Sequence, residues 1–179
     1  MKSKIATTLC VAMFATSLGI SAAADVKFSM DRKKLGQTNT RAANASGRVN
    51  RSVEIKDIIY TIVVESTAFK DLENVTVQYN IYYEEAQPGS KEKPPVRTLA
   101  GKQTIEKLAS YKKVEIDTAP ITMKEVQLDG NYYFVSGASN TSRDRVVGSI
   151  IKAFNSEDKL LGEYSNPSGI SSKFEWKKP

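Results

Sequence analysis

The amino-acid sequence predicts an all-β protein, an immunoglobulin-like β-sandwich of about seven to nine strands without a disulfide. Many short runs alternate apolar and polar residues, which is the side-chain period of a β-strand. Turn-forming residues separate these runs at fairly regular intervals, and no long run has helical spacing. The single cysteine is Cys10, so the chain cannot form an internal disulfide.

Residues 1–24 have the layout of a cleaved secretory signal peptide. Lys2 and Lys4 form a basic head, an apolar run covers residues 5–20, and residues 22–24 are alanines suited to a cleavage site before Asp25. We therefore expect export to the periplasm or the outer surface of a Gram-negative bacterium. Cleavage would lower the formal net charge from +6 to +4 and leave a chain without Cys or His. Because the cut follows the apolar run, the mature chain would lack the helical spine of a pilin subunit.

The residues after the leader predict a short strand and then a basic segment. Val26, Phe28 and Met30 alternate with polar residues, as in a strand. Residues 31–50 are polar and basic with almost no apolar periodicity, which indicates a linker or flexible arm. Ordering of this arm on a partner chain by strand addition is the alternative. The predicted boundaries are therefore 1–24 for the leader, 25–50 for the strand and arm, and 51–179 for the sandwich.

The clearest strand of the predicted sandwich covers residues 74–84, with Val75, Val77, Tyr79, Ile81 and Tyr83 on one face. The pattern over 51–64 changes phase near 57–59, which predicts a β-bulge or a change of sheet. Residues 87–95 form a loop by composition, 104–110 a short helical turn, and 129–131 (Asp-Gly-Asn) a hairpin turn. The other predicted strands are 96–105, 114–118, 124–128, 132–136, 146–154, 160–165 and 173–177, the last placing Phe174 and Trp176 toward the core.

Missing residue types exclude several kinds of chemistry. Without His, neither a Ser-His-Asp triad, a Cys-His pair nor a Cys/His zinc site can form. Residues 110–113 fit the Ser-x-x-Lys pattern, but the partner patterns of that enzyme class are absent. No basic tract with interleaved aromatics and no second long apolar run follows the leader. The sequence thus predicts a non-enzymatic protein without a cofactor, a metal, a nucleic-acid partner or a transmembrane span.

Candidate contact residues come from two tyrosine doublets and from the basic arm. In the first doublet the alternation places Tyr82 outward and Tyr83 inward, and in the second the buried member stays open. The arginines of the arm are candidates because the arm could order on a partner chain by strand addition. The candidate partner-binding residues are Tyr82, Tyr132, Tyr133, Arg41 and Arg48.

Two segments, LENVTVQYNIYYEE (72–85) and the stretch from Val146 to Trp176 with its KLLGEY return, carry a resemblance. The chain resembles small secreted immunoglobulin-like proteins of Verrucomicrobia, of the Akkermansia type, encoded near pilus-related genes. The resemblance implies a surface or pilus-associated role and brings no catalytic residues. The predicted function is structural, adhesive or pilus-accessory, through contacts with envelope or pilus-related proteins or with further copies of the chain. The alternative is a carbohydrate-binding module for mucin glycans, using Tyr82 and one of Tyr132 and Tyr133.

Overall fold

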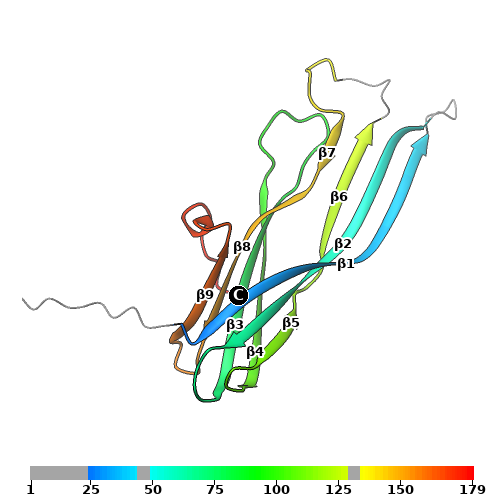
Figure 1. Cartoon of the computed structure of the whole chain (residues 1–179). Helices are drawn as coiled ribbons and strands as arrows, with labels where there is room; N and C mark the ends of the chain where they lie inside the picture. Colours follow the sequence, from blue (N-terminus) through cyan, green and yellow to red (C-terminus); the bar gives the residue numbers. More distant parts are fainter. Residues whose placement is uncertain (1–23, 44–48, 129–133) are drawn as a thin grey trace, which may run out of the picture.

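The computed structural model describes residues 24–43, 49–128 and 134–179. The leader, Arg48, Tyr132, Tyr133 and the 129–131 turn lie outside the described residues. Nine strands, all paired antiparallel, form two sheets that face each other as a sandwich (Figure 1). The all-β prediction is therefore confirmed, and the narrower immunoglobulin-like assignment stays a prediction.

The first sheet has the order β1-β2-β6-β7. On the same side of β2, β6 pairs with residues 51–58 and β5 pairs with residues 61–65. Its strands are β1 (Val26–Ala43), β2 (Val49–Ser66), β5 (Lys113–Asp117), β6 (Ile121–Leu128) and β7 (Thr141–Arg143). The second sheet has the order β4-β3-β8-β9. Its strands are β3 (Leu72–Glu84), β4 (Val96–Leu108), β8 (Arg145–Phe154) and β9 (Leu160–Asn166), and a 3₁₀ helix, η1 (Ile170–Ser172), follows.

The core lies between the sheets and confirms the facing predicted for β3. Val75, Val77 and Ile81 are completely buried in one apolar cluster, and Tyr83 packs against it. β2 supplies the opposite wall of the core with four alternate residues, Ile58, Tyr60, Ile62 and Val64. The period-2 pattern thus identified both walls, because a strand points alternate side chains to one face.

The predicted arm is where the sequence expectation was wrong. Residues 31–43 continue the strand begun at Val26, and β1 pairs with β2 from Val26 to Ala43. The pairing shifts register between Lys34 and Gly36, opposite Asp57 and Ile58. The phase change seen in the sequence near 57–59 therefore corresponds to a bulge in β1, whereas β2 continues without a change of sheet.

Three strands of the first sheet lose their apolar inner face one after another, first β1, then β2 and then β6. Along the inner face, β1 changes from Met30 to Arg32, β2 from Ile58 to Lys56, and β6 from Met123 to Glu125. We call residues 34–43 of β1, 49–56 of β2, 124–128 of β6 and all of β7 the polar extension. Figure 1 shows the far ends of β1, β2 and β6 on the side away from β9, so this part of the sheet continues past the core.

Three local expectations require correction. Residues 104–108 belong to β4, and no helical turn forms there, because Ile105 and Leu108 point into the core. Residues 134–136 are not a strand, and β6 pairs with β7. Residues 173–177 form an irregular segment after η1, in which Phe174 and Trp176 pack on Tyr82, Ile150 and Ile170. This C-terminal cap covers the second sheet on the face opposite the main core.

Candidate functional site

Asp144 lies where the chain leaves the first sheet at the end of β7 and enters the second sheet at β8. Its carboxylate accepts one hydrogen bond from the backbone N–H of Ala86 (2.8 Å) and one from that of Lys124 (2.8 Å). Its own N–H donates to the Lys124 carbonyl (2.9 Å). A single side chain therefore links the end of β3 to β6, and it sets the spacing of the two sheets at this end.

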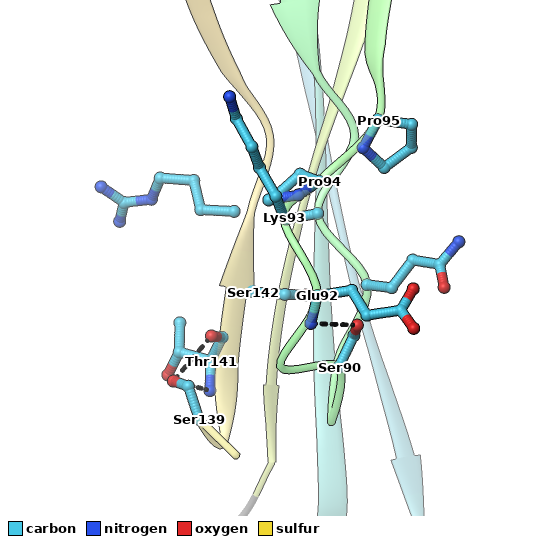
Figure 2. A pocket seen from close by; sticks show the side chains of 11 residues that line it. Ser90, Glu92, Lys93, Pro94, Pro95, Ser139, Thr141 and Ser142 are labelled. Atoms are coloured by element: carbon cyan, nitrogen blue, oxygen red, sulfur yellow. Dashed lines mark hydrogen bonds between the residues drawn. The ribbon is translucent and has the colours of Figure 1, made fainter.

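A cavity of about 520 Å³ lies beside this crossover, between the 86–95 loop and residues 139–143. Figure 2 shows Ser90, Glu92, Lys93, Pro94 and Pro95 on one wall and Ser139, Thr141 and Ser142 on the other. Two hydrogen bonds stiffen the walls: Ser90 Oγ accepts from the Glu92 N–H (3.1 Å), and Ser139 Oγ accepts from the Thr141 N–H (3.1 Å). The hydroxyl groups of this lining, together with the charged side chains of Glu92, Lys93 and Arg143, can bind a polar ligand.

Phe134 packs against the loop of this cavity at Gly89. Gly89 has a φ of 77°, and a Cβ there would lie 2.5 Å from the Phe134 ring, so both conformation and space require glycine. Phe134 directly follows the undescribed residues that include Tyr132 and Tyr133.

The two glutamates of the polar extension, Glu54 and Glu125, are already engaged by cations. Glu125 forms salt bridges with Arg143 (2.6 Å) and with Lys56 (3.7 Å). Lys56 also forms a salt bridge with Glu54 (2.5 Å). The hydrogen bond from Arg143 is the main reason why the pKa of Glu125 lies below its usual range. At the border, Glu84 is held by Arg145 at 2.6 Å.

The cations of β1 differ from those of its neighbours. β1 carries five Lys or Arg residues and one Asp. Within the described part of the chain, Arg32, Lys33 and Arg41 form no salt bridge, and Lys34 Nζ donates only to the uncharged amide oxygen of Gln37. β1 therefore has an uncompensated positive charge.

The outer edge of β1 is free of strand pairing over most of its length in the described structure. At the start of β1, the Asp25 N–H donates to the Leu161 carbonyl (2.9 Å). The Val26 carbonyl oxygen also lies close to Gly162, where an added Cβ would be 2.3 Å from this oxygen. β9 thus closes the first residues of this edge. Further along, β1 pairs with β2 alone, and Leu35 is 60% exposed.

Two hollows follow the inner side of β1. The first, of about 330 Å³, lies between Met30, Arg32 and Tyr60 on the first sheet and residues 146–149 and 166–167 on the second. Burial raises the pKa of Tyr60, and the nearby Arg32 charge opposes this shift. The second hollow, of about 290 Å³, lies in the polar extension and includes Asn39, Arg41 and Glu54 in its walls.

The structure separates the predicted contact residues. Arg41 is exposed on β1 and lines the second hollow, while Arg48, Tyr132 and Tyr133 lie outside the described residues. The expected exposure of Tyr82 was wrong: it points away from the main core as predicted, but it is 1% exposed. The C-terminal cap covers it, because Phe174 stacks on its ring (4.8 Å between centroids) and its hydroxyl donates to the Glu175 carbonyl (3.1 Å).

Sequence reasoning missed other surface features. Phe69 and Tyr111 are 93% and 58% exposed, and their rings meet edge to face with centroids 5.8 Å apart. Asp144 was also not singled out. Nothing in the local pattern around Asp144 indicated that its two hydrogen-bond donors come from separate sheets.

The residues that the structure describes include no group of three or more acidic, His or Cys side chains able to hold a metal ion. In the same residues, no helix combines the length and the apolar character needed to cross a membrane.

Comparisons with known proteins assign no family to this chain. No family model matches the sequence, and no curated protein matches it. Among solved structures, one similar chain is a structural-genomics target named SoR45 (5% identity, TM-score 0.35, covering 87% of this chain and 94% of that one). Another is the putative ApaA protein from Bordetella pertussis (10% identity, TM-score 0.33, covering 79% and 91%). Both TM-scores are below 0.5, so neither likeness supports a functional argument.

Proposed function

We propose that this chain is an exported, non-enzymatic structural or adhesion protein, accessory to pili or other envelope assemblies, that binds other proteins through the outer edge of β1. The observation that carries the proposal is the pairing of β1, an 18-residue strand that is joined to β2 on one side. On its other side, beyond its first residues, β1 pairs with no strand among residues 24–43, 49–128 and 134–179. Such an edge offers a row of backbone donors and acceptors to an added strand.

The sequence supports export and a role through surfaces. The leader has the parts of a cleaved signal peptide, and the chain after Cys10 contains neither Cys nor His, which excludes cysteine nucleophiles, imidazole bases and zinc sites of the Cys/His type. The resemblance to secreted immunoglobulin-like proteins supports a location near pili.

Site-specific photo-cross-linking in intact cells tests the proposal. A photoreactive amino acid at Thr40, exposed on β1, is compared with one at Gln103, exposed on the other sheet's edge strand β4. We expect a discrete cross-linked product with an envelope protein from Thr40 and none from Gln103. No product from either position, or equal products from both, would contradict binding through β1.

Carbohydrate binding is the second candidate, and the exposed Phe69–Tyr111 pair favours it because aromatic rings stack on sugars. Tyr82, the residue first expected in this role, is buried. Binding on a mucin glycan array that is lost in a Phe69→Ala, Tyr111→Ala variant would support this candidate. Silence of the unmodified protein across the array would exclude it for these glycans.

A further inference from the structure

The charge of β1 identifies the kind of strand that this edge can accept. The inference rests on the proposed function, because it concerns the same edge. We propose that the outer edge of β1, from Arg32 to Arg41, binds an extended acidic segment of a partner protein as an additional strand.

The first support is the imbalance of charge. Glu54 on β2, Glu125 on β6 and Glu84 on β3 each already pair with a Lys or Arg at 2.5–3.7 Å. Asp57 on β2, opposite Gly36, accepts a hydrogen bond from Thr122. In the part of the chain that the structure describes, Arg32, Lys33 and Arg41 have no carboxylate within salt-bridge distance. Carboxylates from a partner would supply the missing charge, and electrostatic complementarity would also select the partner.

The other long edge strand provides the comparison. On β4, Arg97 pairs with Glu85 (2.9 Å) and Lys107 with Asp71 (2.8 Å). Its cations are thus mostly balanced within the chain, although β4 is an edge strand too. An acidic segment therefore has a charge reason to choose β1 over β4.

A second copy of this chain fits the edge poorly. Pairing β1 with β1 would bring two strands together that each carry five cations and one acid. Like charges on neighbouring strands are destabilising. Lysines on an edge also hinder non-specific pairing, so the same side chains that exclude a second copy favour an acidic partner.

The faces of β1 define the pattern of the segment. On the inner face, Met30 precedes Arg32 and Lys34, and after the bulge Arg41 lies on that face again. The hollow of about 330 Å³ beside Met30 and Tyr60 has room for one apolar side chain next to Arg32. We therefore expect an apolar residue followed by acidic residues at alternate positions, because side chains two apart share a face.

The test uses the purified protein and a blocked eleven-residue peptide, Leu-Thr-Glu-Thr-Glu-Thr-Glu-Thr-Glu-Thr-Glu, because a strand that starts beside Met30 needs this length to reach Arg41. Gln and Lys versions of its five Glu positions are the controls. Fluorescence anisotropy measures affinity, and amide hydrogen exchange locates the bound peptide. We expect the Glu peptide to bind at least about tenfold more tightly than the Gln peptide, to weaken with salt, and to slow exchange within residues 32–41.

Matched variants assign the effect to β1. The first is a triple variant of β1, which should weaken binding of the Glu peptide at least about tenfold. Its substitutions are Arg32→Gln, Lys34→Gln and Arg41→Gln. The control variant removes three exposed cations elsewhere and should change affinity less than about twofold; its substitutions are Lys102→Gln, Lys112→Gln and Lys177→Gln. Circular dichroism and melting curves establish that both variants are folded.

Equal binding of the Glu and Gln peptides, equal losses in both variants, or exchange protection outside β1 would overturn the inference. The two proposals fail separately. Cross-linking from Thr40 in cells without preference for the acidic peptide would leave the proposed function standing and refute the acidic partner. Preference for the acidic peptide without cross-linking from Thr40 in cells would refute the proposed function and leave the preference of β1 for acidic strands standing.

Discussion

The contact between β1 and β9 depends on Gly162, and an alanine at this position should open the contact. A Cβ at Gly162 would lie 2.3 Å from the Val26 carbonyl oxygen, whereas real Cβ contacts stay above 3.0 Å. The obstructing atom is backbone, so no side-chain rotation can relieve the clash. The start of β1 must move by about 0.7 Å or more, judged from that 3.0 Å limit.

The cost follows from what this movement disturbs. Overpacking of a dense site costs about 1–3 kcal/mol. Weakening the hydrogen bond from the Asp25 N–H to the Leu161 carbonyl adds about 1 kcal/mol. We therefore expect Gly162→Ala to lower the free energy of unfolding by about 2–4 kcal/mol, and the melting temperature by roughly 4–15 °C for a chain of this size.

Gly36→Ala is the matched control on the same strand. A Cβ at Gly36 meets no atom within 4 Å, so this substitution should change the free energy of unfolding by less than about 1 kcal/mol. Urea unfolding followed by circular dichroism, with thermal melts, measures both variants. Equal stabilities for Gly162→Ala and Gly36→Ala would refute the reasoning that a close backbone contact with β9 fixes the start of β1.

Three further substitutions test other contacts. Asp144→Ala leaves two backbone amides without their carboxylate acceptor and should cost about 3 kcal/mol in urea unfolding. Phe174→Ala removes the ring stacked on Tyr82 and should cost about 2 kcal/mol, with a change in tryptophan fluorescence. The hydrogen bond from Arg143 lowers the pKa of Glu125 in the folded state below its ordinary value of 4.5. The ion pair therefore stabilises the folded state fully above pH 4.5, and this stabilisation is lost as the pH falls through the lowered pKa. Glu125→Gln should therefore flatten the acid side of the stability curve.

Each of these substitutions has an exposed counterpart. Asp57→Ala removes one exposed hydrogen bond to Thr122, Phe69→Ala truncates a ring that is 93% exposed, and Glu106→Gln neutralises an exposed carboxylate. These counterparts should change the free energy of unfolding by less than about 1 kcal/mol. Effects as large as those of the three test substitutions would mean that the contacts described at Asp144, Phe174 and Glu125 are not the cause.

The fold could be predicted where a strand passes through the core. Residues 74–84 show the period-2 pattern because one face of β3 is completely buried, and the prediction of that face was correct. The same rule fails on residues 31–43, because the side chains of residues 31–42 are exposed or half-buried and no burial selects apolar residues there. A polar strand held by β2 then looks like an arm in the sequence.

The candidate site was only partly predictable, for a related reason. Arg41 was recognised by its charge, but its lack of an acidic partner among the described residues depends on how distant strands divide the carboxylates between them. Tyr82 was placed on the correct face, but its exposure depends on a contact with Glu175, 93 residues further along the chain. Local periodicity contains no information about either contact.

The sequence by itself determined that this is an all-β chain, which residues of β3 form the core, and that neither Cys nor His follows the leader. These properties depend on residue type and on spacing along one strand. Only the tertiary structure decided that β1 is a long edge strand, that its cations lack acidic partners in the described chain, and that Asp144 links β6 to the loop after β3. The physical reason is that strand pairing, covering and charge balance are contacts between segments far apart in sequence, and only folding brings those segments together.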